Sequence, residues 1–414
     1  MAWGMGTLLL TFLFSVVGYF LTSHLIPAFA PAFLMAGICG KDLCKLHPSS
    51  SEQEKRKPIP ESAGTISAGV YLVIMFLLIP PTFGLHFLES VDSAFPYHQF
   101  VEHLAALLSV ASMVFLGFAD DVLSLKWRHK LLLPTLAALP LLCVYLVNFN
   151  STSVVVPNIY HLRMWIGHTV NLGPFYYVYM GLITVFCTNA INIYAGVNGL
   201  EAGQSLVIAF SIVVFNVTEL TRDPAPHSFS LHFLLPFIGT TLALLKWNWF
   251  PARVFVGDTF CYFAGITFAC VAVLGHFSKT VMLFFLPQLL NFAISLPQLF
   301  RLVPCPRHRL PRPLKTSPDI DVPLLAPSVA LLPRSRPRLI SLVERLGLLS
   351  HVDDGESEER GPQMINLTLI NLVLHLFGPM TEEKLVMRLL LLQVLSSVFA
   401  FVVRYPLARL FYDN

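Results

Sequence analysis

The sequence has few charged residues. Only 12% of its 414 residues are Asp, Glu, Lys or Arg, against roughly 25% in ordinary soluble domains, while 55% are hydrophobic. This composition excludes an ordinary soluble domain and predicts a protein that crosses a membrane several times. The formal net charge of +3 is too small to indicate a nucleic-acid partner.

Several common motifs are absent as well. The sequence contains no CxxC pair, GxGxxG fingerprint, Walker lysine loop or HExxH motif, so dinucleotide, ATPase and zinc-protease interpretations have no support. The seven cysteines lie mostly within or beside apolar runs, and the two Cys-x-x-His pairs, at Cys44 and Cys305, stand in separate loops. A zinc site is therefore disfavoured.

Long apolar runs dominate what is present. Windows of about 20 residues predict ten membrane spans. They cover approximately residues 6–28, 65–84, 101–119, 131–149, 174–192, 205–220, 229–247, 260–276, 280–300 and 385–403. The first run is expected to be retained as a span, because no basic segment precedes it and it exceeds the apolar core of a signal peptide. The predicted fold class is an all-α polytopic membrane protein.

The region 301–383 differs from the rest. It holds nine prolines between residues 304 and 337 and an acidic patch at 353–359, which favours a small cytosolic insertion of mixed, partly disordered structure between spans nine and ten. The predicted domains are a nine-span catalytic core (1–300), this insertion (301–383), and a tenth span with a lumenal tail (384–414). The apolar stretch 365–377 is expected to be a surface or buried element, since it is short and contains two asparagines and a histidine.

The cations are distributed unevenly between the predicted loops. Loops after odd-numbered spans hold nineteen Lys or Arg residues, and the alternate loops hold three. This positive-inside bias predicts that the odd-numbered loops are cytosolic and the amino terminus lumenal or external. Only Arg404 and Arg409, after the last span, go against the rule. The polar motifs of the chain all lie in or beside the odd-numbered loops, so we expect them to converge on one face of the bilayer.

Two adjacent acids, Asp120 and Asp121, follow the third span directly, and five residues from Lys126 to Lys130, four of them basic, come shortly after. Adjacent carboxylates repel unless a metal ion or cations offset them. Such a group is suited to hold a phosphate through Lys130 while a carboxylate accepts a proton or directs a metal ion. The alternative is a helix end with solvated charges, and the motif alone does not decide between the two.

Two further motifs interrupt the apolar pattern. Asn189, Asn192 and Asn198 alternate with glycines at the end of the fifth span, where amide oxygens suit Mg²⁺ and glycines admit a nucleotide, although turn chemistry also explains Asn198. Asp258 opens the eighth span just after Phe255. This acid is either a helix cap or a metal ligand, and the aromatic ring either stacks on a base or lies at the membrane rim.

A basic segment, Arg307-His308-Arg309, stands among prolines after the ninth span, where guanidinium and imidazole groups suit a diphosphate or a sugar phosphate. The positive-inside rule explains the charge of this segment, but it does not explain the prolines that stiffen the loop around it. Glu61, in Ile-Pro-Glu-Ser before the second span, is explained equally well as a helix beginning.

Taken in this order, the motifs around Glu61, Asp120, Asn192, Asp258 and Arg307 resemble those of the eukaryotic UDP-N-acetylglucosamine dolichyl-phosphate N-acetylglucosaminephosphotransferases. These tunicamycin-sensitive enzymes of the endoplasmic reticulum membrane are relatives of bacterial polyprenyl-phosphate sugar-1-phosphate transferases. The resemblance extends from the first span to the last and is weak at about 312–362 and near the amino terminus. It implies transfer of GlcNAc-1-phosphate from UDP-GlcNAc to dolichyl phosphate on the cytosolic face, with Mg²⁺ as cofactor, the lipid bilayer as environment and a homodimer as the assembly.

The same resemblance implies a role for each motif residue. It makes Asp120 the group that orients or deprotonates the acceptor, with Asp121 in support and Lys130 and Asn189 facing the lipid phosphate. It implies metal ligands at Asn192 and Asp258; uridine contacts at Lys41, Asp42, Leu43, Glu61, Gly196, Asn198 and Phe255; a diphosphate contact at Arg307; and GlcNAc contacts at His308 and Arg309.

Two positions depart from the family pattern. Ser124 stands where Asn is expected, and Lys41 where Gln is expected, which puts one polar contact beside the acid pair and one uridine contact in doubt. The nearest rival interpretation is a related transferase with another sugar nucleotide or a shorter polyprenol. A transporter is disfavoured. Transporters typically place ionisable groups near the middle of the membrane, whereas the predicted spans carry almost no charge there and His232 is the chief exception. Release of UMP from UDP-GlcNAc separates an enzyme from a transporter.

Overall fold

The computed structural model places most of the chain. It describes residues 4–42, 58–84, 95–123, 125–149, 152–156, 163, 165, 167–305, 310–314, 324–332, 341, 343–345, 347–350 and 363–411. Leu43, Ser124 and the basic triplet 307–309 lie outside the described residues.

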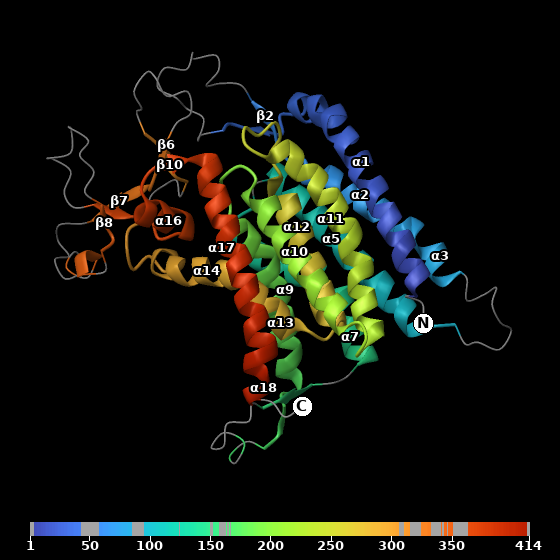
Figure 1. Cartoon of the computed structure of the whole chain (residues 1–414). Coiled ribbons are helices and arrows are strands. Elements are labelled where there is room, and N and C mark those ends of the chain that lie inside the picture. Colours follow the sequence, from blue (N-terminus) through green and yellow to red (C-terminus); the bar gives the residue numbers. More distant parts are fainter. Residues whose placement is uncertain are drawn as a thin grey trace.

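Helices account for nearly all of the architecture, and the predicted all-α polytopic fold is confirmed (Figure 1). Eight helical segments in the described part of the chain are long and apolar enough to cross a membrane: α1 (Met5–Met35), α2 with α3 (Gly64–Leu77 and Ile79–Phe83), α5 (Tyr97–Leu123), α9 (Pro174–Ile193), α10 (Leu200–Glu219), α11 (Pro224–Asn248), α12 (Gly257–Leu274) and α17 with the helical turns after it (Glu382–Leu410). Two bent pairs in the described part of the chain raise the count to as many as ten if each pair is one span, which is the number that the sequence predicts.

Each bent pair consists of two helices that meet at a break in the chain's helical path. α6 (Trp127–Ala137) and α7 (Leu139–Asn148) meet at 46°, and α13 (Ser278–Phe284) and α14 (Leu286–Leu299) meet at 70°. The second helix of each pair carries a proline in its first turn, Pro140 or Pro287. Proline lacks an N–H and clashes with the preceding turn, so the apolar pattern continues while the helix changes direction.

The strands are short and lie outside the helical bundle. They are β1 (Cys39–Gly40) with β2 (Ile59–Pro60); β3 (Ser153–Val155) with β4 (Thr169–Asn171); β5 (Arg312–Pro313), β6 (Leu324–Ala326) and β10 (Met380–Thr381) in the order β10-β6-β5; and β7 (Val329–Leu331), β8 (Leu349–Ser350) and β9 (Gln363–Ile365) in the order β7-β9-β8. All pairs are antiparallel.

The stretch 365–377 does not cross the membrane, as predicted. It forms the end of β9 and the nine-residue helix α16 (Leu369–Phe377), which packs against α17. Figure 1 shows α16 beside the upper part of α17 and next to the small strands. The insertion is therefore attached to the last span rather than separate from the bundle.

α12 lies at the centre of the bundle and packs against α5, α9, α2 and α11. Its neighbours approach closely at two glycines. A side chain at Gly117 of α5 would meet the backbone of Thr259 at 2.6 Å, and one at Gly265 of α12 would meet the backbone of Thr188 at 2.4 Å. Small residues permit such close packing between membrane helices. The polar ends of α5, α9 and α12 are thereby held side by side.

The two termini lie at the end of the bundle opposite β1, β2 and the strands of the insertion, and the β3–β4 pair lies near the C-terminus. In Figure 1 both the N and C labels are near the lower end of the helices, while β2, β6 and β10 lie at the upper end. The described odd-numbered loops thus gather at one end of the molecule, as the sequence predicts.

Candidate active site

Two acidic side chains share one lysine at the upper end of the bundle. Lys130 Nζ lies 2.7 Å from Asp120 Oδ2 and 2.6 Å from Asp258 Oδ2. Asp120 lies in the last turn of α5, and Lys130 and Asp258 lie in the first turns of α6 and α12, so the ends of three helices meet here. The Asp120 side chain is fully buried, and it also accepts a hydrogen bond from Tyr262 Oη at 3.2 Å. Asp120 is therefore not the solvated helix end of the alternative interpretation.

The asparagines at the end of α9 complete this cluster. Asn192 Nδ2 donates to Asp258 Oδ1 at 2.7 Å, so both oxygens of Asp258 are contacted. Asn189 Nδ2 donates to the backbone carbonyl of Lys130 at 3.2 Å. This bond ties α9 to α6 and holds the lysine near the acids.

Asp121 contacts the start of α12 instead of the lysine. Its Oδ1 accepts the backbone N–H of Asp258 at 2.6 Å, and its Oδ2 accepts the hydroxyls of Ser62 and Thr259, each at 2.5 Å. A carboxylate at a helix N-terminus satisfies free N–H groups and interacts favourably with the helix dipole. Gly257, with φ of +75°, brings the turn so close that a Cβ would lie 2.6 Å from Asp121 Oδ2. Asp121 therefore fixes where Asp258 stands.

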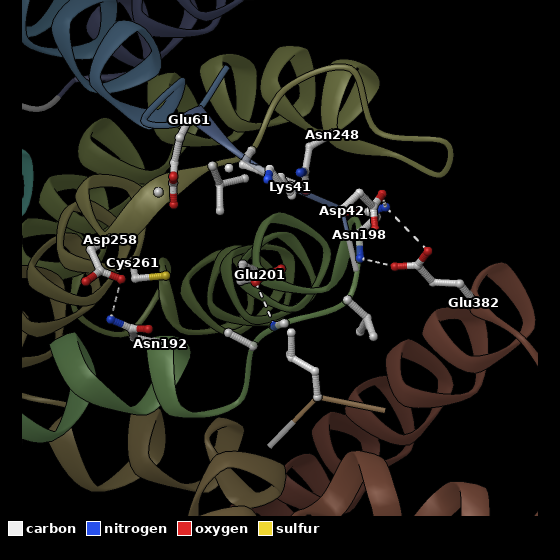
Figure 2. A pocket seen from close by; sticks show the side chains of 18 residues that line it. Lys41, Asp42, Glu61, Asn192, Asn198, Glu201, Asn248, Asp258, Cys261 and Glu382 are labelled. Carbon is white, nitrogen blue, oxygen red and sulfur yellow. Dashed lines mark hydrogen bonds between the residues drawn. The ribbon is translucent and has the colours of Figure 1, made fainter. Parts of the chain in front are cut away.

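A cavity of about 280 Å³ opens next to Asp258 (Figure 2). It is lined by Gly40, Lys41, Asp42, Glu61, Asn192, Ala195, Gly196, Val197, Asn198, Glu201, Asn248, Phe255, Val256, Gly257, Asp258, Cys261, Leu310 and Glu382. Figure 2 shows Asp258 with Asn192 on one side of the cavity, and Asn198 with Asp42 and Glu382 on the other. The cavity thus extends from the lysine-bridged acids toward a second polar group.

The roof of the cavity comes from the β1–β2 hairpin and the segment before α12. The backbone N–H of Phe255 donates to Pro60 at 2.8 Å, and a Cβ at Gly40 would lie 3.1 Å from the Phe255 ring. Glu61 projects into the cavity from this layer (Figure 2). Burial raises the pKa of the Glu61 carboxyl, and the negative charges of Asp121 and Asp258 raise it further.

The floor is the loop between α9 and α10. Gly196 has φ of +110°, a conformation that glycine adopts without strain, and its N–H donates to Glu201 Oε1 at 2.9 Å. A Cβ at Gly196 would collide with Leu310, which lies directly after the basic triplet in the sequence. The insertion therefore reaches the cavity at this point.

Two acidic residues of the cavity were not among the predicted site residues. Glu201 lies in the asparagine motif, and its position in the first turn of a span would have suggested it. No pattern in the sequence singles out Glu382, which lies at the start of α17. Its Oε1 accepts the backbone N–H of Asn198 at 2.7 Å across 184 positions of sequence. Only the three-dimensional fold shows this contact.

The structure brings together most of the predicted site residues. Asp120, Lys130, Asn192 and Asp258 form one cluster, and the cavity wall contains Lys41, Asp42, Glu61, Gly196, Asn198 and Phe255. Asn189 lies against the lysine backbone, and Asp121 lies beneath the start of α12. The predicted residues Leu43, Arg307, His308 and Arg309 fall outside the described residues, as does the departure at Ser124.

Several proteins of known name are similar in sequence to this chain. Residues 103–276 match glycosyl transferase family 4. The chain is 43% identical to the UDP-N-acetylglucosamine–dolichyl-phosphate N-acetylglucosaminephosphotransferase of Saccharomyces cerevisiae and 42% identical to that of Schizosaccharomyces pombe, in each case over 97% of this chain and 92% of the relative. It is 27% identical to the phospho-N-acetylmuramoyl-pentapeptide-transferase of Acetivibrio thermocellus, over 47% of this chain and 61% of that protein.

The family match at residues 103–276 covers the part of the chain that contains Asp120, Lys130 and Asp258, whereas the two fungal matches extend over nearly the full length of both chains. The chain belongs to the family of UDP-N-acetylglucosamine–dolichyl-phosphate N-acetylglucosaminephosphotransferases.

Proposed function

We propose that this protein transfers GlcNAc-1-phosphate from UDP-GlcNAc to dolichyl phosphate, giving GlcNAc-diphosphodolichol and UMP. This reaction is the first step of lipid-linked oligosaccharide synthesis for protein N-glycosylation. The observation that carries the proposal is the contact of Lys130 with both Asp120 and Asp258 beside a polar cavity at the end of the helical bundle. A phosphorylated lipid in the membrane and a nucleotide sugar in the cavity would meet at this lysine.

The nucleotide sugar is assigned to the cavity. Uridine would lie at the end formed by Gly196, Asn198 and Phe255, with Glu61 above it. The diphosphate would then extend toward Asp258, where the family resemblance also places Arg307. The same resemblance assigns GlcNAc to His308 and Arg309. Lys41, Asp42 and Leu43 are proposed as further contacts on the uridine side.

A magnesium ion fits the donor set beside the cavity. Asp258 and Asn192 supply a carboxylate and an amide, which are hard oxygen ligands, and in the described residues no group of three or more His, Cys, Asp or Glu side chains forms a complete metal cage. Mg²⁺ commonly takes one or two protein ligands and completes its shell with substrate phosphates and water. When bound, it would neutralise charge on the diphosphate. Asn192 must turn its amide oxygen toward the ion, because its nitrogen now faces Asp258.

The residues of the lysine-bridged cluster have separate tasks in the transfer. Lys130 binds the acceptor phosphate and offsets its charge, and Asp120 orients or deprotonates that phosphate from below. Asp121, whose oxygens are already bonded to the start of α12, positions Asp258. Phosphoryl transfer depends mostly on such positioning and charge neutralisation.

The acceptor phosphate is proposed to attack the β-phosphorus directly. A lipid phosphate is largely ionised at neutral pH and needs little activation, while Asp120 is bound to Lys130 and Tyr262 and is poorly placed as a free nucleophile. Incubation with UDP-GlcNAc alone, followed by mass spectrometry, tests this route. A stable GlcNAc-phosphoryl group on Asp120 or Asp121, formed with release of UMP, contradicts direct attack.

The cellular setting is proposed on the same basis. We place the protein in the endoplasmic reticulum membrane with the cavity facing the cytosol, and as a homodimer. The uneven distribution of Lys and Arg supports the orientation. Accessibility labelling of single cysteines in the loops at Asp120 and Asp258 tests it, since labelling from opposite leaflets contradicts a single site.

The reaction is tested on purified protein with dolichyl phosphate and either UDP-GlcNAc or UDP-GalNAc. We expect UMP release and a GlcNAc-diphospholipid product with UDP-GlcNAc, and loss of both after EDTA or tunicamycin. Restoration by MgCl₂ after EDTA separates metal dependence from denaturation. Binding of UDP-GlcNAc without UMP release refutes the transferase and favours transport.

A further inference from the structure

Asn198 is bonded to two acidic side chains that lie far from it in the sequence. Its Nδ2 donates to Asp42 Oδ2 at 2.8 Å and to Glu382 Oε2 at 3.4 Å, while its backbone N–H donates to Glu382 Oε1 at 2.7 Å. Asn198 is 6% exposed and Glu382 only 2% exposed, so water hardly competes for these bonds. Glu382 therefore contacts both the backbone and the side chain of one cavity residue (Figure 2).

These contacts set the direction of the Asn198 amide. Carboxylates accept hydrogen bonds and do not donate them, so the NH₂ group must face Asp42 and Glu382. If the amide were reversed, its carbonyl oxygen would face two negative groups. The Asn198 Oδ1 is left over, and it accepts no hydrogen bond from the part of the chain that the structure describes. Since Asn198 lines the cavity, this oxygen is the acceptor that its side chain can offer to a ligand there.

We propose that Glu382 is a positioning residue that acts together with Asp42. It holds Asn198 by its backbone N–H at 2.7 Å, and the two carboxylates orient the side-chain amide so that the nucleotide base meets a hydrogen-bond acceptor. The inference rests on the proposed function, in which uridine lies against Asn198. Uracil has an N–H donor at N3, whereas cytosine has an acceptor nitrogen at the same position. A polar site built for a donor rejects a ligand that lacks it, so the arrangement selects uracil over cytosine.

An ordinary role for Glu382 is stabilisation of its own helix. It is the first residue of α17, where an acid interacts favourably with the helix dipole. Glu383 has nearly the same position relative to that dipole, but it is exposed and does not line the cavity. Replacement of Glu383 therefore removes the helix contribution alone and provides a matched control.

The test uses full-length protein with Glu382→Ala, Glu382→Gln and Glu383→Ala. Steady-state kinetics are measured with each substrate varied in turn, together with inhibition by UMP and by CMP. Loss of a charge-assisted hydrogen bond predicts that Glu382→Ala raises the KM for UDP-GlcNAc roughly tenfold or more. The kcat and the KM for dolichyl phosphate should change less than about twofold. The preference for UMP over CMP should fall.

Glu382→Gln should lie between the two extremes, because glutamine keeps one acceptor oxygen but places a donor against the other Asn198 N–H. Glu383→Ala should match the unsubstituted protein. The inference is overturned if Glu382→Ala keeps its UDP-GlcNAc KM and its UMP preference. It is also overturned if the KM values of both substrates rise together with a lower melting temperature, since this result indicates a structural role alone.

The outcome for the proposed function is read separately. If the unsubstituted protein and Glu383→Ala produce no UMP from UDP-GlcNAc and dolichyl phosphate, the proposed reaction is wrong. Calorimetric binding of UMP and CMP to the same proteins then still tests Glu382. Equal affinity for both nucleotides in the unsubstituted protein rejects the positioning role.

Discussion

Replacement of Lys130 by methionine tests the lysine-bridged cluster most directly. Methionine has a similar length and no charge, so the carboxylates of Asp120 and Asp258, which lie 2.7 and 2.6 Å from the ammonium, lose their shared partner. Removing one member of a buried ion pair costs about 3–5 kcal/mol. Because the side chains of Lys130 and Asp258 keep 23% and 26% exposure, we expect a smaller loss, about 2–3 kcal/mol of unfolding free energy.

The same substitution should change the response to magnesium. In the unsubstituted protein the ammonium of Lys130 occupies Asp258 Oδ2 and competes with a divalent cation for it. Without the lysine, a cation near Asp258 relieves the repulsion between the two acids. We therefore expect MgCl₂ to raise the melting temperature of Lys130→Met more than that of the unsubstituted protein. A free Mg²⁺ concentration one hundred times the dissociation constant raises the free energy of unfolding by about 2.7 kcal/mol.

Thermal unfolding of both proteins in the same detergent, with MgCl₂ titrated into each, measures these effects without reference to turnover. Lys126→Met is the matched control, because Lys126 is an exposed cation of the same loop. It should change neither the melting temperature nor the magnesium response. The reasoning is refuted if Lys130→Met has an unchanged melting temperature, or if its melting temperature responds to MgCl₂ no more than that of the unsubstituted protein.

Three further substitutions address the neighbouring acids. Asp258→Ala should abolish UMP release while leaving the unfolding temperature nearly unchanged, and near-normal turnover at saturating Mg²⁺ refutes the metal role. Asp121→Asn places a hydrogen-bond donor against the N–H groups at the start of α12. It should lower the free energy of unfolding by about 1–3 kcal/mol and reduce turnover. A variant with unchanged stability and normal kcat argues against positioning of Asp258 through Asp121. The Glu61 pKa is raised above 4.5 in the folded state, so stability falls as pH rises above that value. Glu61→Gln should remove the part of this loss of stability that is due to Glu61. Melting temperatures measured between acid and neutral pH test this, and the same pH dependence in both proteins contradicts the raised Glu61 pKa.

The spans were predictable because each follows from a local property, the apolar length needed to cross a bilayer. Ten predicted spans match the eight helical segments and two bent pairs. The bends were not predicted, although Pro140 and Pro287 were visible, because proline is also common in straight membrane helices whose neighbours satisfy the freed carbonyls. The angle at each break depends on packing against α9, α12 and α17, which no local pattern contains.

The site was predictable where a polar residue interrupts an apolar run. Asp120, Asn192 and Asp258 stand at the ends of spans, and the topology requires those ends to meet at one face. The separate contacts of the two adjacent acids were not predictable. Asp120 and Asp121 are adjacent in the chain, yet one faces Lys130 and the other the start of α12, because successive helical residues point about 100° apart. Glu382 was missed because its position depends on the fold of the insertion and the last span together.

The charges around the cavity explain why the reaction is expected to need a cation. The described lining holds five carboxylates, of Asp42, Glu61, Glu201, Asp258 and Glu382, and Lys41 is the one basic side chain among these described lining residues. A nucleotide diphosphate is itself negative, and repulsion between like charges is strong where water is scarce. Asp42 and Glu382 are partly offset by the Asn198 amide, and Glu201 by the Gly196 N–H. At the proposed diphosphate end, Asp258 is paired with Lys130, but this single ammonium is shared with Asp120, so two carboxylates have one cation between them. A positive charge must therefore enter with the substrate at that end, from a metal ion, from the basic triplet, or from both.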